Sequence, residues 1–303
     1  MLDTIIIGSG PAGLAAAIYA KRAELDMLVL EKSSMSGGQV LSTYEVDNYP
    51  ALPGISGMEL GMKMREHADK LGASFAEEEV LAIDKTDGGF KVRTDAGVHE
   101  TRTVIYAAGA HHTNLNVPGE EDLQGMGVSY CATCDGAFFR GFDVAVVGGG
   151  DVAVEDAIFL SRICNKVYLI HRRDSLRAAA SLQTKLFAAG NVELVWDSVT
   201  ERIEGKDEVT GITVKNVKSG ESRTLAVSGV FIAVGIRPDS EILEGLAESD
   251  EKGYIKAGED TTTSCPGIYA AGDVRTKGLR QIVTAVADGA NAVTAVQDYL
   301  NRS

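Results

Sequence analysis

Two cysteines separated by two residues, Cys131 and Cys134, are the side chains of this sequence that point most directly to chemistry. A Cys-x-x-Cys pair can cycle between a dithiol and a disulfide without a large backbone movement, because its sulfurs lie within bonding reach. Asp135 follows at once and is a candidate acid–base group for a thiol and its thiolate. The alternative is that Asp135 caps the turn before Gly136. The sequence segments on either side of the pair indicate which electron donor to expect.

A zinc site is the main alternative use for two close cysteines, and it would need a second close pair or nearby histidines. The other cysteines, Cys164 and Cys265, are isolated in the sequence, and His111 and His112 lie well upstream of Cys131. The spacing therefore indicates redox chemistry without a metal, and it predicts that Cys164 and Cys265 are buried or incidental thiols. For His112 we favour a solvent-facing position after a strand over the role of a catalytic base.

The first glycine-rich segment lies at the N-terminus, where a short apolar strand runs into the motif GSGPAG at residues 8–13. An alanine-rich helix follows, and the next strand ends in Glu31. Gly8 permits the turn, Gly10 lets the backbone approach a pyrophosphate, and Gly13 lets the helix pack on the strand. Glu31 can accept hydrogen bonds from a free ribose hydroxyl. This half is predicted to bind a dinucleotide whose adenosine ribose carries no phosphate.

The motif GGGDVA at residues 148–153 repeats this design between a second apolar strand and a second helix. Gly148 and Gly150 correspond to the first two glycines, and alanine replaces the third, as the fingerprint permits. The acid is not repeated. Glu31 lies 23 residues after Gly8, whereas the same distance after Gly148 leads to His171-Arg172-Arg173.

Cations at this position change the nucleotide that is expected. A carboxylate would repel a 2′-phosphate, whereas guanidinium groups bind phosphate oxygens through charge-assisted hydrogen bonds. We therefore expect NADPH rather than NADH at a site formed by His171, Arg172 and Arg173, with Arg177 as a further candidate for the same phosphate. The alternative is a basic surface turn.

The complete series of motifs resembles that of the low-molecular-weight thioredoxin reductases, flavoproteins of the two-dinucleotide-domain disulfide reductase superfamily. The resemblance covers nearly the whole chain. Its motifs are GSGPAG at 8–13, GGQ at 37–39, CATCDG at 131–136, GGGDVAVE at 148–155, HRRDSLRA at 171–178, AGD at 271–273 and RQ at 280–281.

The resemblance implies an α/β fold with two Rossmann-like dinucleotide-binding domains. An FAD domain would comprise residues 1–112 and 246–303, and an NADPH domain of residues 113–245, which carries the dithiol, would be inserted into it. Turn formers at 116–120 and 235–239 would be the two linkers of a hinge. The implied FAD contacts are Gly8, Gly10, Gly13, Glu31, Gln39, Asn48, Asp273 and Gln281. The implied NADPH-domain residues are Gly148, Gly150, His171, Arg172, Arg173 and Arg177.

The implied activity is a relay in which NADPH reduces FAD, FAD reduces the Cys131–Cys134 disulfide, and the dithiol reduces thioredoxin or a thioredoxin-like protein. By resemblance Cys134 is nearer the flavin and begins the exchange, and Cys131 completes it; the residues alone leave this order open. The dithiol cannot face the flavin and a protein substrate in one arrangement, so we expect one domain to rotate on the other. The family also implies a homodimer.

Two segments remain open to more than one interpretation. Phe138, Phe139 and Arg140 follow the dithiol and are candidates for docking a partner or the flavin domain, although core packing of the two phenylalanines is the favoured alternative. The family usually shows Ala-Thr-Gly-Ala where this chain has residues 107–110, and an arginine near residues 111–114, so contacts at the domain junction are expected to differ.

Composition limits the remaining functions. A chain of 303 residues suits two domains, and a formal charge of −14 argues against nucleic-acid binding. We expect no membrane helix, because no apolar run reaches about 20 residues. The N-terminus lacks a secretion signal, so we expect a cytoplasmic protein. The rival hypotheses are a flavin reductase that uses ferredoxin, an oxidase of a small-molecule dithiol, and a non-catalytic flavin-binding module; each leaves the dithiol or the second nucleotide site without a role.

Overall fold

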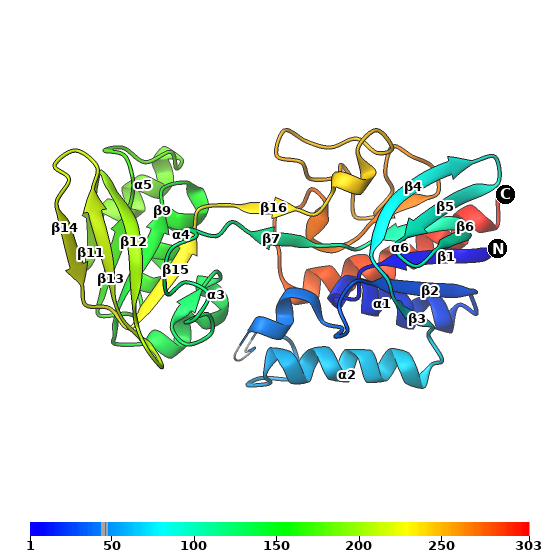
Figure 1. Ribbon diagram of the computed structural model, residues 1–303, viewed down its shortest axis with the longest axis horizontal. Helices are drawn as coiled ribbons and strands as arrows, with labels where there is room; N and C mark the ends of the chain where they lie inside the picture. Colours follow the sequence, from blue (N-terminus) through cyan, green and yellow to red (C-terminus); the bar gives the residue numbers. More distant parts are fainter. Residues whose placement is uncertain (44–45, 47, 303) are drawn as a thin grey trace. The chain divides into compact units, whose positions relative to one another are not determined.

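The chain forms two compact units in the computed structural model, which describes residues 1–43, 46 and 48–302 (Figure 1). Unit 1 comprises Met1–Leu41, Tyr49–His111 and the chain from Arg237 onward. Unit 2 comprises His112–Ile236, together with the described residues of the segment 42–48. Unit 2 is therefore an insertion between two strands of unit 1. No helix of the described residues is long and apolar enough to cross a membrane.

A seven-stranded sheet in the order β3-β2-β1-β6-β5-β4 forms the centre of unit 1, with β17 paired to β6. The strands β1, β2, β3, β6 and β17 are mutually parallel, whereas β4 and β5 form an antiparallel hairpin on β6. The strands are β1 (Leu2–Ile7), β2 (Met27–Glu31), β3 (Phe75–Glu77), β4 (Val80–Thr86), β5 (Gly89–Thr94), β6 (Val98–Tyr106) and β17 (Ile268–Ala270).

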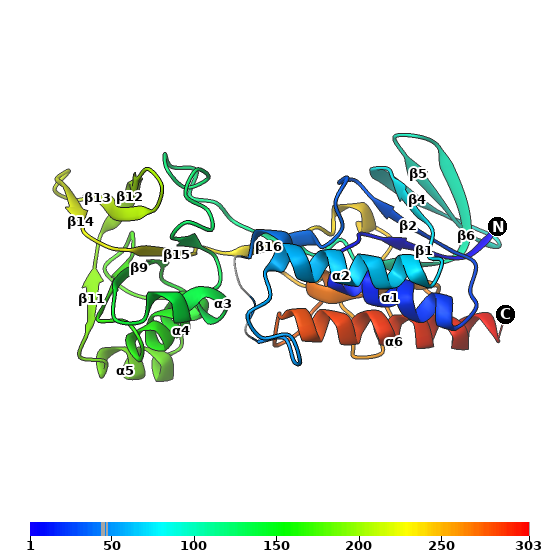
Figure 2. The ribbon, with the colours of Figure 1, turned by 90° about the horizontal axis from the view of Figure 1, so that it is seen from below.

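Helices α1 and α6 cover one face of this sheet, and α2 lies beside α1 (Figure 2). Small residues allow the first two helices to approach closely, because a Cβ at Gly289 of α6 would overlap the carbonyl oxygen of Ala12 in α1. The helical segments of unit 1 are α1 (Pro11–Arg22), α2 (Gly57–Lys70), α6 (Ile282–Leu300) and the 3-10 turns η1 (Gly38–Ser42), η3 (Glu241–Leu243) and η4 (Gly272–Val274).

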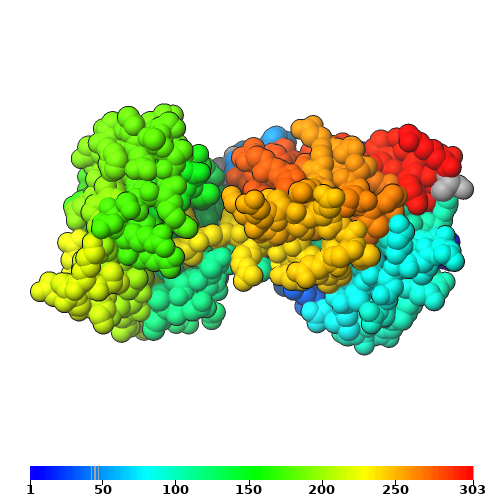
Figure 3. Space-filling view, turned by 90° about the horizontal axis from the view of Figure 1, so that it is seen from above, coloured from blue at the N-terminus to red at the C-terminus, as the bar shows by residue number. Residues whose placement is uncertain are grey.

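The opposite face of the sheet is covered by the irregular chain between residues 239 and 267, where Leu243 and Ile255 are fully buried against strand residues such as Ile5. Figure 3 shows this segment, coloured gold to orange, as a surface layer beside the cyan β4–β5 hairpin. The chain thus returns to unit 1 at Arg237, earlier than the predicted residue 246, because residues 237–245 already contribute to the core of unit 1.

Unit 2 has three layers, which Figure 2 shows on the left. A parallel sheet in the order β11-β10-β9-β15-β8 lies between helices α4 and α5 on one face and an antiparallel sheet of β12, β13 and β14 on the other. The parallel strands are β8 (Val128–Ser129), β9 (Asp143–Gly148), β10 (Lys166–Ile170), β11 (Val192–Val195) and β15 (Gly229–Ala233). The other elements are β12 (Ser198–Gly205), β13 (Val209–Asn216), β14 (Ser222–Leu225), α3 (Ala132–Asp135), η2 (Gly136–Phe139), α4 (Asp151–Ser161) and α5 (Ala180–Phe187).

The two crossings of the chain pair with each other as β7 (Ala110–His112) and β16 (Ile236–Pro238). The exit crossing falls within the predicted linker 235–239. The entry crossing lies before the predicted linker 116–120, which is instead part of unit 2. There the buried carboxylate of Glu120 accepts hydrogen bonds from the amides of Leu115, at 2.9 Å, and Asn116, at 2.7 Å. The predicted α/β class with two strand–glycine turn–helix units is confirmed.

Candidate active site

Cys131 and Cys134 are joined in a disulfide at the start of the single-turn helix α3, with their Cα atoms 5.3 Å apart. The carbonyl oxygen of Cys131 accepts hydrogen bonds from the amides of Cys134, at 3.2 Å, and Asp135, at 3.1 Å, which closes the turn. Both cysteines are partly exposed. The predicted redox pair is therefore a bonded and accessible disulfide. Cys164 and Cys265 are free and buried, as expected of incidental thiols.

The Asp135 carboxyl lies beside this disulfide in a largely buried position. Its Oδ2 accepts a hydrogen bond from the hydroxyl of Ser129 at 2.6 Å, whereas its Oδ1 is buried and has no hydrogen-bond partner. Burial raises the pKa of Asp135, and the hydrogen bond from Ser129 opposes that shift. The side chain makes no capping hydrogen bond to the following turn, so the capping alternative finds no support.

Close packing against α4 holds the Cys-x-x-Cys segment in place. A Cβ at Gly136 would lie 2.9 Å from side-chain atoms of both Phe159 and Leu160, so glycine lets the chain approach α4 closely without moving these two side chains. Phe139 packs edge to face on Phe231 with ring centroids 5.3 Å apart, as the core-packing alternative predicts. Phe138 differs, because 37% of its surface is exposed next to the disulfide.

The first glycine turn has the geometry that its motif predicts. Gly8 has φ +95°, and a Cβ there would lie 2.5 Å from the carbonyl oxygen of Ala107 on the neighbouring strand end. Gly13 lies directly on the Gly8 carbonyl, where a Cβ would overlap it. Glu31 ends β2 above this turn, and its Oε2 accepts hydrogen bonds from the amide and the hydroxyl of Ser9, both at 2.8 Å. The acid and the turn therefore lie together.

The segment around Gly37 and Gly38 also lies against this turn. Gly37 donates its amide to the Ser9 carbonyl at 2.8 Å, and a Cβ at Gly38 would lie 3.2 Å from the Cα of Gly10. Gln39 follows in η1 and is exposed. Asn48 is also exposed, but it is grouped with unit 2, unlike the other predicted flavin contacts.

The AGD segment approaches the turn through Gly272, where a Cβ would lie 3.0 Å from the Cβ of Ala12 at the start of α1. Asp273 follows, and its Oδ1 is buried without a hydrogen bond, with Lys277 Nζ 3.9 Å away. Burial raises the pKa of Asp273. A buried acceptor left unsatisfied beside a helix N-terminus fits a bound polar group that supplies hydroxyl donors. Gln281 caps the N-terminus of α6 through a capping box with Thr284.

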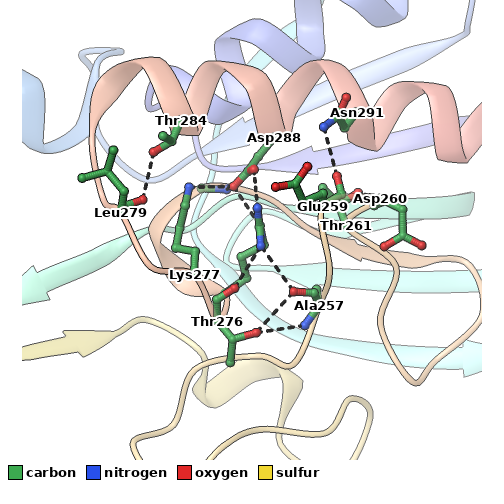
Figure 4. Close-up of polar contacts among 12 residues, drawn as sticks. Ala257, Glu259, Asp260, Thr261, Thr276, Lys277, Leu279, Thr284, Asp288 and Asn291 are labelled. Carbon is green, nitrogen blue, oxygen red and sulfur yellow. Dashed lines mark hydrogen bonds and ion pairs between the residues drawn. The ribbon is translucent and has the colours of Figure 1, made fainter.

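Asp288, which our sequence analysis did not identify, fixes the AGD segment from α6. Its carboxylate accepts hydrogen bonds from the Gly272 amide at 2.9 Å and from two nitrogens of Arg275. It also accepts one from Lys277 at 2.8 Å (Figure 4). Burial opposes its ionisation, but the hydrogen bonds from Arg275 and Lys277 lower the pKa of Asp288 overall. A lone acid within the apolar helical run 282–296 was the available signal, because buried acids are normally paired.

The second glycine turn follows β9 in unit 2. Gly148 has φ +157°, and a Cβ there would lie 2.5 Å from the Ala233 carbonyl oxygen and 2.6 Å from the Ala153 side chain. Gly150 is the N-cap of α4 and has open space where a Cβ would stand. A phosphate could therefore approach this backbone, and the helix N-terminus would favour its negative charge.

The predicted cations gather at this turn. The His171 imidazole is buried directly against Gly149, where a Cβ would overlap the ring, and its Nε2 has no hydrogen-bond partner. Arg177 donates its amide to the Gly149 carbonyl at 2.8 Å. Burial, and next the charge of Arg177, lower the pKa of His171, with smaller effects from Arg172 and Arg173. The imidazole thus favours its neutral form.

The three arginines Arg172, Arg173 and Arg177 are exposed, and within the described ranges none of them forms an ion pair with an acid. Unpaired guanidinium groups beside a helix N-terminus are suited to a phosphate ester. The residues present therefore fit a dinucleotide with a 2′-phosphate in unit 2 and one with a free adenosine ribose in unit 1.

The fold and the disulfide place the chain in a known class. The family model described as pyridine nucleotide-disulphide oxidoreductase matches residues 2–289, which is most of the chain. The chain belongs to this family of oxidoreductases.

Individual relatives narrow the assignment. A crystal structure of thioredoxin reductase from Streptococcus pyogenes matches with a TM-score of 0.95 and 46% identity, over 100% of this chain and 99% of that one. The thioredoxin reductase of Bacillus subtilis is 44% identical over 98% of this chain and 94% of its own length. That of Listeria monocytogenes is 45% identical over 98% and 93%. Within the class, the chain is a member of the thioredoxin reductases, which confirms the resemblance seen in the motifs; this membership implies a flavoenzyme that also uses a nicotinamide nucleotide.

Proposed function

We propose that this protein is an NADPH-dependent, FAD-containing thioredoxin-disulfide reductase. The observation that carries the proposal is the Cys131–Cys134 disulfide, which is accessible and has the buried carboxyl of Asp135 beside it. The rival functions, electron transfer to ferredoxin and flavin binding without catalysis, give such a disulfide no role.

FAD would occupy unit 1. Gly8, Gly10 and Gly13 would receive its pyrophosphate at the N-terminus of α1, Glu31 would accept from the adenosine ribose, and the unsatisfied Oδ1 of Asp273 would accept from a hydroxyl. Gln39, Asn48 and Gln281 complete the proposed contacts. When bound, the flavin supplies a two-electron couple between a hydride donor and a disulfide.

NADPH would occupy unit 2, with its phosphates at Gly148 and Gly150 and its 2′-phosphate at Arg172, Arg173 and Arg177. His171, held neutral by burial, would close the base of this site against Gly149. We attribute the preference for NADPH to the guanidinium groups, since an acid like Glu31 is missing from the corresponding position.

The reduced pair would transfer its electrons by thiolate exchange. One cysteine thiolate attacks a sulfur of the thioredoxin disulfide, a mixed disulfide forms, and the other thioredoxin sulfur leaves as a thiolate. The second cysteine then attacks the mixed disulfide and restores the Cys131–Cys134 bond. Two electrons and two protons thereby pass to thioredoxin, and Asp135 would exchange protons with the reacting sulfurs. We assign the first attack to Cys134 and keep Phe138 as the docking candidate.

Because the dithiol belongs to unit 2 and the proposed flavin contacts lie mainly in unit 1, turnover requires the units to move relative to one another. The paired strands β7 and β16 are the proposed hinge. We further propose a homodimer, and a cytoplasmic location, since that compartment keeps protein thiols reduced.

An anaerobic titration of the purified protein tests the proposal. NADPH should bleach the flavin absorbance far more effectively than NADH, and the reduced protein should reduce thioredoxin stoichiometrically. Cys134→Ser should still accept hydride but should not reduce thioredoxin. Bleaching by reduced ferredoxin but not by NADPH would contradict the assignment.

A further inference from the structure

Ser129 is a second polar side chain at the disulfide, placed there by the end of strand β8. It is 5% exposed, and all of its hydroxyl contacts are to the Cys-x-x-Cys segment. The hydroxyl donates to Asp135 Oδ2 at 2.6 Å, accepts from the amide of Cys131 at 3.0 Å, and lies 3.4 Å from the Cys131 carbonyl oxygen. One hydroxyl thus joins the proposed acid–base group to the backbone of a reacting cysteine.

We propose that Ser129 is a positioning residue for disulfide exchange, which holds Asp135 so that its Oδ1 is the oxygen that exchanges a proton with sulfur. The inference rests on the proposed function and deepens it. It follows from the different environments of the two oxygens: Oδ2 is occupied by the Ser129 hydroxyl, whereas Oδ1 is buried and has no partner.

The exchange step balances with this assignment. Asp135, as a carboxylate, takes the proton of one cysteine thiol as that sulfur attacks the partner's disulfide. The S–S bond of the partner breaks, a mixed disulfide forms, and the proton passes from Asp135 to the partner sulfur that leaves. The carboxyl ends the step as it began, and the electron pair of the new S–S bond comes from the attacking thiolate.

The hydrogen bond also tunes Asp135. Burial favours the neutral acid and raises its pKa, while a donor to Oδ2 stabilises the carboxylate and lowers it. The elements packed most closely against α3 are η2 and α4, and with the residues that follow each of them they bring the charged side chains Arg140, Asp151, Glu155, Asp156 and Arg162. None of these contributes to the shift of Asp135, whose causes are burial and Ser129. Losing the hydroxyl should therefore move the pH at which the carboxylate forms upward.

The experiment uses the purified protein reduced with a phosphine and freed of it, then mixed with 5,5′-dithiobis(2-nitrobenzoic acid) across a range of pH. The rate constant should rise with pH as Asp135 ionises, and Asp135→Asn should lack that rise, which identifies it. In Ser129→Ala the rise should shift to higher pH by about one pH unit, the effect expected for a lost hydrogen bond to a charged group. On the acid side this lowers the rate constant about tenfold. Ser129→Thr keeps the hydroxyl and should restore the profile.

Ser198→Ala is the matched control, because Ser198 is also 5% exposed in unit 2 and donates its hydroxyl to the Trp196 carbonyl, away from the disulfide. It should leave the profile where it is. An unshifted rise in Ser129→Ala, or no recovery in Ser129→Thr, would overturn the proposal.

If Ser129→Ala does not fold, the infrared carbonyl band of neutral Asp135, identified by its loss in Asp135→Asn, decides the question. A frequency lowered by a hydrogen bond supports the proposal, and an unbonded frequency contradicts it. Neither measurement uses NADPH, flavin reduction or thioredoxin, so a failure of the proposed function remains distinguishable.

Discussion

Asp288 and Arg275 form a buried two-point ion pair, in which Arg275 Nη2 and Nε donate to the two carboxylate oxygens at 2.6 and 2.9 Å. Lys277 shares the same carboxylate. Removing the acid leaves the buried Arg275 without its counter-charge and Lys277 with only the longer contact to Asp273, and breaking such a group costs about 3–5 kcal/mol. We expect Asp288→Asn to lose about that much unfolding free energy in urea and to retain less flavin on purification. The exposed pair Lys70–Glu66 offers a control, since solvent screens this pair and Glu66→Gln should leave the unfolding free energy nearly unchanged. Equal stability of the two variants would contradict the structural role of Asp288.

Glu120 organises the chain that enters unit 2, because it accepts two short amide hydrogen bonds, a longer one from the Val117 amide at 3.4 Å and one from the Tyr130 hydroxyl at 2.8 Å. In Glu120→Gln an amide donor would face these amide donors, so we expect a loss of about 2–3 kcal/mol. Tyr130→Phe removes one hydrogen bond only and should cost about 1 kcal/mol. Urea denaturation of both variants gives the comparison, and a smaller loss for Glu120→Gln than for Tyr130→Phe would show that the amide contacts are unimportant.

Asp156 on α4 provides a pH-dependent prediction. Burial, followed by the charge of Glu155, raises the pKa of Asp156 to about 7 in the folded protein, above its ordinary value of 3.8. The unfolded chain therefore ionises first as the pH rises, so this group reduces stability progressively between about pH 4 and pH 7. Asp156→Asn should be more stable than the wild type at pH 8, by on the order of 2 kcal/mol. The gain should be clearly smaller at pH 5 and should largely vanish at pH 4. The same gain at pH 5 and pH 8 in chemical denaturation would rule out this origin.

The arginines of unit 2 give a prediction about nucleotide choice. Replacing Arg172 and Arg173 together by alanine removes charge-assisted hydrogen bonds to the proposed 2′-phosphate, each worth about 1.5–3 kcal/mol. We expect the KM for NADPH to rise at least tenfold, and that for NADH to change little. Arg223→Ala, at an exposed arginine of β14 paired with Glu193, is the control. A parallel rise in both KM values would place the arginines outside the phosphate site.

Local features of the site could be predicted because glycine requirements are local. Gly8 and Gly148 both have positive φ, and each lies where a side chain would meet the carbonyl of a neighbouring strand end, as the motifs predict. The number of residues from the first turn glycine to the end of the next strand is likewise set within one strand–helix–strand unit. Counting the same number from Gly148 therefore correctly predicted that the His171 segment lies beside the second glycine turn.

Side-chain contacts that no motif specifies could not be predicted. Ser129 and Glu120 bond to residues near them in the sequence, Asp135 and Tyr130, but only the irregular path of the chain brings these side chains together. The predicted boundary at residue 246 differs from the start of the last segment of unit 1 at Arg237, since Leu243 joins unit 1 through packing against strands far away in the sequence. Asp288 could be predicted in part: the apolar helical sequence around it indicates a buried acid, but it does not indicate which cations pair with that acid.

The pairing of β7 with β16 has a consequence for how the chain is built. Asp239 donates its amide to the Gly109 carbonyl at 3.1 Å, and His111 Nδ1 lies 2.7 Å from Asp239 Oδ1, so the chain on either side of the interruption at residues 112–236 is in contact. Removal of residues 112–236, the main segment of unit 2, therefore leaves no gap to span. A short loop that joins residue 111 to residue 237 should give an autonomous unit 1, in which the proposed flavin site can be studied without the second nucleotide site.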